Sequence, residues 1–421
     1  MITTIEVLPG VTLRCFPANR FKQGCLSIQF LRPMRREEAS VNALIPAVLL
    51  RGTVRHPDLR AITLHLDDLY GASVCALVRR LGDYQTMGLY CGFIEDRYAL
   101  SGDAVLEPML DFVEELLMDP ILEDGGFNRE FVESEKRNLI ITLESERNDK
   151  RAYAAAQLMN HMCRADSFGV PRLGQVEQAE KIDAVSAWEH YQTILRDSPA
   201  EIFYVGSAQP ELVASKLRRL FGRMERNPRP LPEQTPFHDG GKGYYEEQME
   251  ISQAKLCMGF VTPIDHRHPD FAAMQVLNTV FGSGMTSKLF MNVREKLSLC
   301  YSIGSGYYGS KGIMTVSAGI DADKQQLVTD QILAQLQACR AGDITPEELT
   351  AAKEAILSGL RGIYDSPGSI EGFESAAAIG SLAMTAQEYY RAVEAVTVQQ
   401  VADAAKTVEQ HTTYILKGVQ P

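Results

Sequence analysis

The residues best suited to metal chemistry lie close together at positions 265–270, which read Asp-His-Arg-His-Pro-Asp. His266 and His268 are only two residues apart and flank the cation Arg267, so a solvated connection explains the pattern better than a metal site. No two histidines in the sequence are four residues apart. Both contiguous helix signatures of zinc peptidases, H-E-x-x-H and H-x-x-E-H, are therefore absent.

Two other patterns associated with binding or catalysis occur in the sequence, but the elements expected around them exclude that role. Residues 304–309 satisfy G-x-G-x-x-G, but they are expected between a helix and a strand, the reverse of a dinucleotide site, so a glycine-rich hairpin is the better interpretation. Asp67 and Asp68 are adjacent on an expected helix and point about 100° apart, which excludes a carboxylate dyad. His65 and Asp68 form at most a local surface pair.

Composition and charge narrow the class of protein. The chain has 421 residues, of which 45% are hydrophobic and 23% charged, with a formal net charge of −12. This acidity disfavours nucleic acid and anionic membrane partners, and no apolar run approaches the ~20 residues of a membrane span. The eight cysteines are scattered without C-x-x-C, which is typical of reduced thiols, and we expect a cytoplasmic protein.

The elements around these residues repeat. Residues 225–245 are rich in proline and glycine and separate two regions with the same order of elements. We therefore predict a first half at 1–224, a linker at 225–245 and a second half at 246–421. Pro33 and Pro263 lie 230 residues apart, and Gly92 and Gly319 lie 227 apart. Matching strands are expected at 25–33 and 255–263 and at 88–96 and 313–323, and matching helices at 41–50 and 271–281, 64–69 and 288–299, 104–117 and 325–336, and 128–143 and 345–360.

This pattern predicts an α+β fold of two homologous halves, each with a mixed or antiparallel sheet covered by helices. One segment is specific enough to suggest a family. Residues 281–302, FGSGMTSKLFMNVREKLSLCYS, resemble the signature of the second half of the pitrilysin, insulysin and mitochondrial processing peptidase family, the inverted-zincin metallopeptidases. Residues 167–175, 188–191 and 200–207 are similar to that family's first half, so the resemblance covers essentially the whole chain.

The resemblance implies a zinc site that has been lost. Counting back from Arg51-Gly-Thr53, the family's H-x-x-E-H falls on Ala43, Pro46 and Ala47, and its distal glutamate falls on Thr142. A hydrolytic zinc site needs three ligands and a base, and these residues supply none of the four. No metal cofactor is expected in this chain. Pro46 also predicts a kink or an early turn in its helix.

The second half keeps a pair that the resemblance assigns to substrate binding, Arg294 and Tyr301. A guanidinium and a phenol can orient a peptide carbonyl and stabilise its oxyanion. Their seven-residue spacing predicts one helix face, provided that the helix extends so far. In the alternative interpretation, Arg294 pairs with surface carboxylates and Tyr301 belongs to the core.

Taken together, the resemblance implies a clam-shell chamber around an extended peptide and a non-catalytic, substrate-binding subunit of a heteromeric zinc peptidase. A homologous sister chain supplies H-x-x-E-H and the zinc. The isolated chain, for which a homodimer is one expected state, cleaves no peptide. The alternative is an inactive homologue that binds a peptide or protein during peptide maturation or protein modification. A third hypothesis, an active peptidase with a rebuilt metal site, requires stoichiometric zinc.

Overall fold

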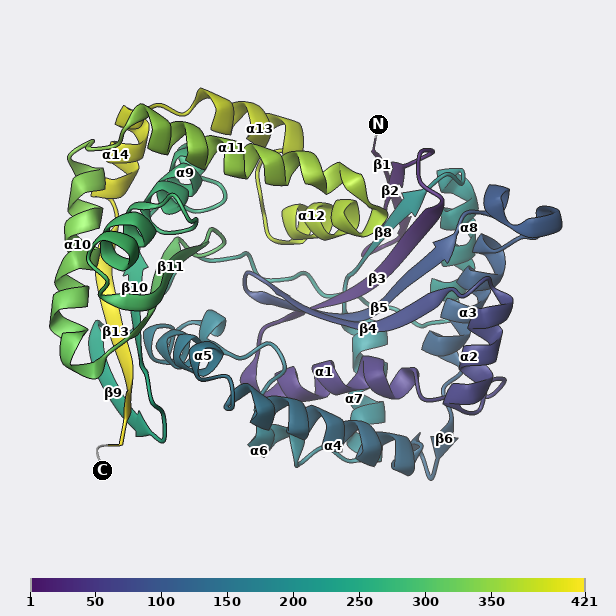
Figure 1. Ribbon diagram of the computed structural model, residues 1–421. Helices are drawn as coiled ribbons and strands as arrows, with labels where there is room; N and C mark the ends of the chain where they lie inside the picture. The colour runs from purple at the N-terminus through teal and green to yellow at the C-terminus, as the bar shows by residue number, and fades with distance from the viewer. Residues whose placement is uncertain (1, 420–421) are drawn as a thin grey trace. The chain divides into compact units, whose positions relative to one another are not determined.

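The computed structural model describes residues 2–419, which form two compact units (Figure 1). The first unit contains the residues up to Glu144, Val170–Glu233 and Tyr364–Ser375. The second unit contains Ser145–Gly169, Gln234–Ile363 and the residues from Ala376 onward. Each unit has one mixed sheet with helices against it, which confirms the α+β prediction.

The first unit is built on a six-stranded sheet of order β1-β2-β8-β3-β5-β4. Only β2 and β8 are parallel; the other neighbours are antiparallel. The central strand β3 is buried along most of its length because helices cover both of its faces. The strands are β1 (Thr3–Leu8), β2 (Val11–Pro17), β3 (Gln23–Pro33), β4 (Ser73–Leu81), β5 (Tyr84–Ile94) and β8 (Ala200–Gly206), and a separate hairpin joins β6 (Leu122–Glu123) to β7 (Gly126–Phe127).

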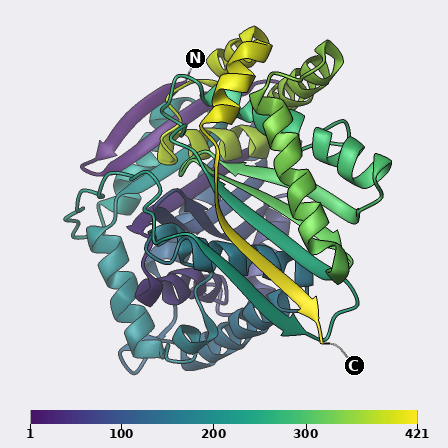
Figure 2. The same ribbon diagram turned by 90° about the vertical axis from the view of Figure 1, so that its left-hand side faces the viewer.

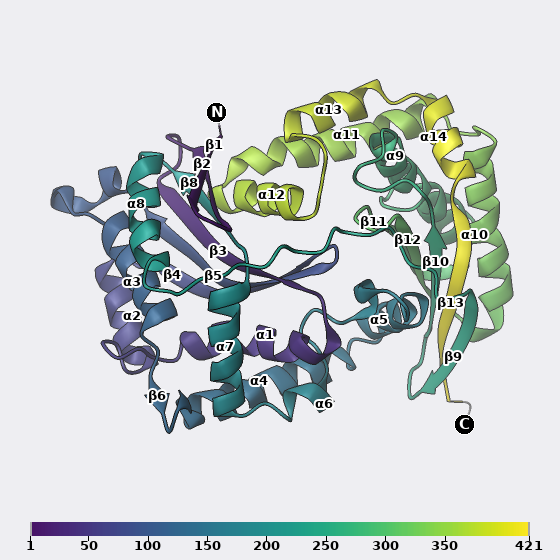
Figure 3. The ribbon, with the colours of Figure 1, turned by 180° about the vertical axis from the view of Figure 1, so that it is seen from behind.

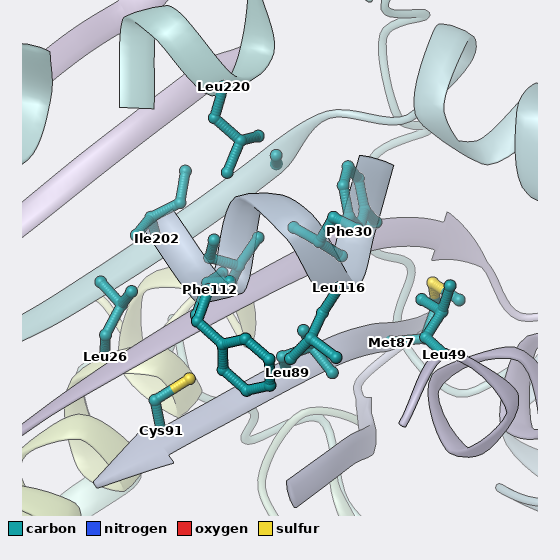
Figure 4. Close-up of a cluster of buried hydrophobic side chains, with 14 of the residues drawn as sticks. Leu26, Phe30, Leu49, Met87, Leu89, Cys91, Phe112, Leu116, Ile202 and Leu220 are labelled. Carbon is teal, nitrogen blue, oxygen red and sulfur yellow. The ribbon is translucent and has the colours of Figure 1, made fainter. Parts of the chain in front are cut away.

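A large apolar core fixes the helices of the first unit on this sheet. Leu26 and Phe30 of β3 and Leu89 of β5 meet Phe112 and Leu116 of α3 in the interior (Figure 4). All five side chains are fully or almost fully buried. The helices are α1 (Arg36–Leu49), α2 (Leu59–Asp68), α3 (Leu106–Met118), α4 (Arg129–Glu146), α6 (Val176–Ala179), α7 (Ala184–Asp197) and α8 (Pro210–Phe221).

The second unit is built on a five-stranded sheet of order β11-β12-β10-β13-β9, in which β13 and β9 are the parallel pair (Figure 2). The strands are β9 (Gly243–Met249), β10 (Ala254–Val261), β11 (Cys300–Tyr308), β12 (Ile313–Ile320) and β13 (Glu409–Gly418). The helices are α9 (Phe271–Phe281), the π-helix η4 (Leu289–Lys296), α10 (Gln325–Arg340), α11 (Pro346–Gly362), α13 (Ala386–Ala395) and α14 (Val398–Lys406).

The two sheets confirm the duplication and its register. Without β1, the first order, β2-β8-β3-β5-β4, matches β9-β13-β10-β12-β11 strand by strand, including the parallel pair. Gly92 lies opposite Cys25 in the first ladder, and Gly319 lies opposite Lys255 in the second. The two glycines therefore occupy equivalent ladder positions, as their spacing predicts.

Two helices come from one half of the sequence but belong, wholly or in part, to the compact unit formed mainly by the other half. The helix α5 (Lys150–Met162) comes from the first half but packs in the second unit, where Ala154 and Leu158 contact Cys257 and Tyr414; it lies on the opposite side of that sheet from α10 (Figures 1 and 3). The start of α12 (Pro367–Ile379) comes from the second half but belongs to the first unit. The compact units thus differ from contiguous halves by these exchanged segments, and the boundaries at 225 and 245 stay a prediction.

Buried Glu371 attaches the start of α12 to the first sheet. Its carboxylate accepts hydrogen bonds from Ser27 (2.7 Å) and Gln29 (3.1 Å), and it pairs with Arg79 at 2.8 Å. Of the kink or early turn expected at Pro46 in α1, the early turn is wrong, because the helix continues through Pro46 to Leu49; the kink stays a prediction. Over residues 2–419 no helix combines the length and apolarity needed to cross a membrane.

Candidate functional site

Three of the four positions implied for zinc chemistry line one hollow of the first unit, with a volume of about 300 Å³. Ala43 and Ala47 reach it from α1, and Thr142 reaches it from α4. Pro46, at the position of the base, is buried within α1 and is not part of the lining. The remaining lining residues are Leu44, Ala76, Val78, Glu135, Asn138, Leu139, Arg172 and Leu173.

The donor atoms around this hollow do not fit zinc. Two of the expected ligands are methyl groups, and the Thr142 hydroxyl donates to the Asn138 carbonyl at 2.9 Å. Glu135 is the one carboxylate of the lining, and it pairs with Arg51 at 3.3 Å and accepts from Asn138 Nδ2 at 3.1 Å. Zinc requires several histidine, cysteine or carboxylate ligands together. Among residues 2–419 no group of three such side chains could hold a metal ion.

A sheet edge borders the same hollow. The strand β4 is last in the sheet order, so one of its edges has no strand partner among residues 2–419. Arg172 Nη1 donates to the Val78 carbonyl at 2.9 Å, which shows that this carbonyl faces the open edge. By the two-residue period of a strand, the backbone groups of Val74 and Ala76 face the same way. Ala76 and Val78 also turn their side chains to the hollow.

The Arg294 and Tyr301 side chains line a second hollow, of about 380 Å³, in the second unit. Arg294 lies in η4 and Tyr301 lies in β11, because the helix ends at Lys296. The expectation of one shared helix face is therefore wrong; the turn between the helix and the strand brings both residues to the hollow instead. The other lining residues are Glu295, Ser298, Leu299, Cys300, Asp321 and Lys324.

Both side chains of this pair are accessible. Tyr301 is 63% exposed, which contradicts a core role, and its hydroxyl donates to Asp321 Oδ1 at 3.3 Å. Lys324 binds the other oxygen of Asp321 at 2.8 Å, and this hydrogen bond holds the pKa of the Asp321 carboxyl below its usual value. The Arg294 guanidinium lies 4.6 Å from the centre of the Phe290 ring and 3.6 Å from Glu295. The hollow is thus lined by cationic donors, Arg294 and Lys324, and by an anionic acceptor, Asp321.

The π-helix holds Arg294 through contacts with neighbouring helices. The Leu297 N–H donates to the Asn292 carbonyl five residues earlier at 3.1 Å, the hydrogen bond that defines this helix type. Lys288, which is almost fully buried, pairs with Glu348 at the start of α11 at 2.9 Å. Asn292 Nδ2 donates to Gln335 of α10 at 2.7 Å. π-Helical turns are frequent at functional sites, and here one carries the candidate guanidinium.

Sequence reasoning missed several lining residues and a helix type. Asp321 and Lys324 follow β12 in an acidic turn, which was a visible signal, whereas Arg172 reaches its hollow through packing that no local pattern encodes. The side chains of His266 and His268 form hydrogen bonds within the fold. His266 Nδ1 lies 3.1 Å from the Gly380 carbonyl, and His268 Nδ1 accepts from the Asp270 N–H at 3.1 Å.

Comparison with known proteins gives consistent similarities. Residues 181–356 match the family described as peptidase M16 inactive domain. A probable inactive metalloprotease of Bacillus subtilis (strain 168) is 28% identical over 411 residues, 98% of this chain and 96% of that protein. The crystal structure of a conserved protein from Enterococcus faecalis V583 is 26% identical, with a TM-score of 0.92 over 100% of this chain and 99% of the other. A peptidase M16 inactive domain from Pseudomonas fluorescens shares the fold, with a TM-score of 0.81 over 100% and 98% of the two chains at 17% identity.

Proposed function

We propose that this chain, which matches the peptidase M16 inactive domain over residues 181–356 and lacks H-x-x-E-H, is the non-catalytic, substrate-binding subunit of a heteromeric zinc peptidase. A homologous sister chain carries H-x-x-E-H and the zinc. This chain contributes binding surfaces for an extended peptide but no metal and no base. The acidic charge and the cysteines, seven of which are buried and none of which forms a disulfide among residues 2–419, support a cytoplasmic complex without nucleic acid.

One observation supports peptide binding most strongly: the vacated hollow lies beside the open edge of β4. An extended peptide can pair with the backbone groups of Val74 and Ala76 by strand addition. Residues directly opposite each other in a sheet turn their side chains to the same face, so the residue opposite Ala76 faces the hollow. Methyl groups at Ala43 and Ala47 make that space suitable for an apolar side chain.

Arg294 and Tyr301 support the second contact with the peptide. Arg294 offers donors to solvent in this hollow, and the exposed Tyr301 hydroxyl, which donates to Asp321 at 3.3 Å, lies in the same hollow. A guanidinium that donates to a carbonyl forms the stronger, charge-assisted kind of hydrogen bond. The anchored π-helix limits the motion of Arg294, so little conformational entropy is lost when a carbonyl binds. Together these features support a role in orienting the peptide chain across from a partner's metal.

The alternative is an inactive homologue that binds a peptide or a protein during peptide maturation or protein modification without any hydrolysis. It uses the same strand edge and the same donors but needs no sister chain. The name of the Bacillus subtilis relative, a probable inactive metalloprotease, favours neither version over the other. A cleavage assay separates them.

The test is to purify this chain and a homologous chain that retains H-x-x-E-H, and to measure kcat/KM for a fluorogenic peptide with each chain alone and with both. We expect activity only from the mixture. The double variant Arg294→Ala, Tyr301→Phe should lower kcat/KM of the mixture by about 100-fold, since it removes two donors to the substrate. Lys296→Ala, on the same π-helix but outside the hollow, is the matched control and should leave kcat/KM unchanged.

Activity of the mixture that is unaffected by the double variant contradicts the assignment of Arg294 and Tyr301. Absence of cleavage in the mixture, combined with tight peptide binding by this chain alone, contradicts the heteromeric peptidase and supports the alternative.

A further inference from the structure

The first unit contains another hollow, of about 530 Å³, away from the vacated zinc position. Phe16 at the end of β2 and Phe21 in the loop after it form one wall. Tyr364, Ile370 and Glu374, from the exchanged segment that ends in α12, form the other. This volume is within the range of sites for small ligands, about 300–1,000 Å³, and the mostly apolar lining with few polar groups is typical of them.

The carboxylate of Glu374 is the unusual group in this lining. It is half-buried, yet it makes no hydrogen bond or ion pair within residues 2–419, the range the structure describes. Burial raises the pKa of Glu374, and the charge of Arg14 acts in the opposite direction. Arg14 is itself bound to Glu201 at 3.0 Å, so it is not available as a direct partner.

Glu371 lies one helical turn earlier on α12 and, unlike Glu374, has a hydrogen-bond or ion-pair partner for each carboxylate oxygen. It has Arg79, Ser27 and Gln29 as partners and is fully buried. A carboxylate taken out of water without such partners is costly. One carboxylate of this helix therefore lies in a complete hydrogen-bond network, whereas the second, Glu374, lies in a mostly apolar hollow in which no cation pairs with it among residues 2–419.

The remaining charge at this hollow is Arg20, which is exposed and lies over the Phe21 ring with 4.7 Å between the guanidinium carbon and the ring centre. Within residues 2–419 Arg20 forms no ion pair with Glu374. Aromatic rings attract cations through their negative faces, so the rings of Phe16 and Tyr364, which line the same hollow, add to the preference for a cation that the carboxylate sets.

We infer that this hollow binds an alkylammonium group of a peptide, with the ammonium on Glu374 and the apolar stem against Phe16, Phe21 and Ile370. Both a lysine side chain and the amino-terminal residue of a peptide have this chemistry. The inference rests on the proposed function only in that the ligand belongs to a peptide; the hollow lies wholly within the first unit of this chain and needs neither zinc nor a sister subunit.

The probe is 1-hexylammonium, with 1-hexanol as its uncharged analogue, titrated calorimetrically into the full-length chain. We expect hexylammonium to bind at least tenfold more tightly than hexanol, and Glu374→Gln to remove that difference while hexanol binding is unchanged. Glu177→Gln, an exposed carboxylate on α6 of the same unit, is the control and should bind like the natural chain. Tyr364→Ala, which removes one aromatic wall, should weaken hexylammonium about threefold.

Equal binding of hexylammonium and hexanol overturns the inference, as does unchanged binding in Glu374→Gln with an unchanged melting temperature. Competition by peptides then identifies the source. Displacement by a lysine-free peptide with a free amino terminus indicates the amino-terminal residue, and displacement by an N-acetylated peptide with an internal lysine indicates the side chain. Displacement by neither contradicts a peptide ligand. None of these outcomes depends on cleavage, so failure here is distinguishable from failure of the proposed function.

Discussion

Ala43 of α1 and Thr142 of α4 line the same hollow, although they belong to helices that are far apart in the chain. Both are positions at which the family resemblance expects a zinc ligand. We interpret their convergence as a backbone framework of the site that persists without its donor atoms. On this interpretation, the chain differs from zinc-bearing relatives at this site in its side chains and not in its architecture.

This persistence predicts that a metal site can be restored. The variant Ala43→His, Ala47→His, Thr142→Glu should bind about one zinc ion per chain, because three ligands suffice for a catalytic-type site. Zinc content after dialysis, measured by mass spectrometry, is the readout. Ala43→His, Ala47→His alone is the matched control and should retain much less zinc. A folded triple variant that binds no zinc would show that the framework has also diverged.

The contact between α12 and the first sheet should contribute more to the free energy of unfolding than an exposed ion pair of the same unit does. Glu371→Ala leaves Arg79, Ser27 and Gln29 without their shared acceptor. Removing one partner of a buried pair costs about 3–5 kcal/mol, and we expect about 3 kcal/mol because Arg79 keeps 30% exposure. The measurement is urea unfolding. Glu211→Ala breaks the exposed pair with Arg218 on α8 and should cost less than about 1 kcal/mol; similar losses for both variants would refute the prediction.

Acid should destabilise the protein partly through His65. Burial first, and then the charge of His56, lower the pKa of His65, while Glu115 and Asp68 act in the opposite direction by less. A lowered pKa in the folded state means that the unfolded chain binds more protons, so the contribution of His65 to stability is present above about pH 6.5 and is lost as the pH falls towards the folded pKa.

The variant His65→Phe tests this, because a phenyl ring can keep the ring contacts with His56 (4.5 Å) and Phe112 (4.7 Å) without titrating. Its melting temperature should fall less than that of the natural chain between about pH 7.5 and about pH 5.5. Some decrease remains, since burial also lowers the pKa of His161, His190 and His266. Identical decreases in both proteins would exclude a role for His65.

The turn that follows the π-helix with Arg294 contains a residue in the left-handed region, Ser298, with a φ of +51°. Glycine adopts this conformation freely, so Ser298→Gly should keep or slightly raise the melting temperature. A β-branched residue is strained there, and Ser298→Val should lose about 1–3 kcal/mol. Equal melting temperatures for the two variants would indicate that the turn relaxes without strain.

Local patterns were sufficient to predict the duplication. The spacing of Gly92 and Gly319 reflects their equivalent places in the two ladders, because a shift of one residue in a strand would turn every side chain to the wrong face. The same reasoning located α4 and α11, whose first turns carry the expected side-chain caps at Asn128 and Thr345. Periodicity and capping are properties of neighbouring residues, and the sequence displays them directly.

Other features depend on contacts between distant segments. Nothing in the apolar period of α5 tells which sheet it covers, so its packing against β10 and β13 was not predictable from its own residues. Pro46 does not end α1, most of whose residues are buried, and a local rule about proline contains no information on such tertiary burial. Arg294 and Tyr301 meet through a turn after a π-helix, whose hydrogen bonds no simple sequence rule specifies.

The most direct test of a metal-free, non-catalytic chain is to incubate the isolated natural protein with excess zinc, dialyse it, and measure its zinc content and its cleavage of a peptide library together. We predict far less than one zinc ion per chain and no cleavage above background. About one zinc ion per chain, with cleavage that a chelator abolishes, would contradict the account and establish a rebuilt metal site.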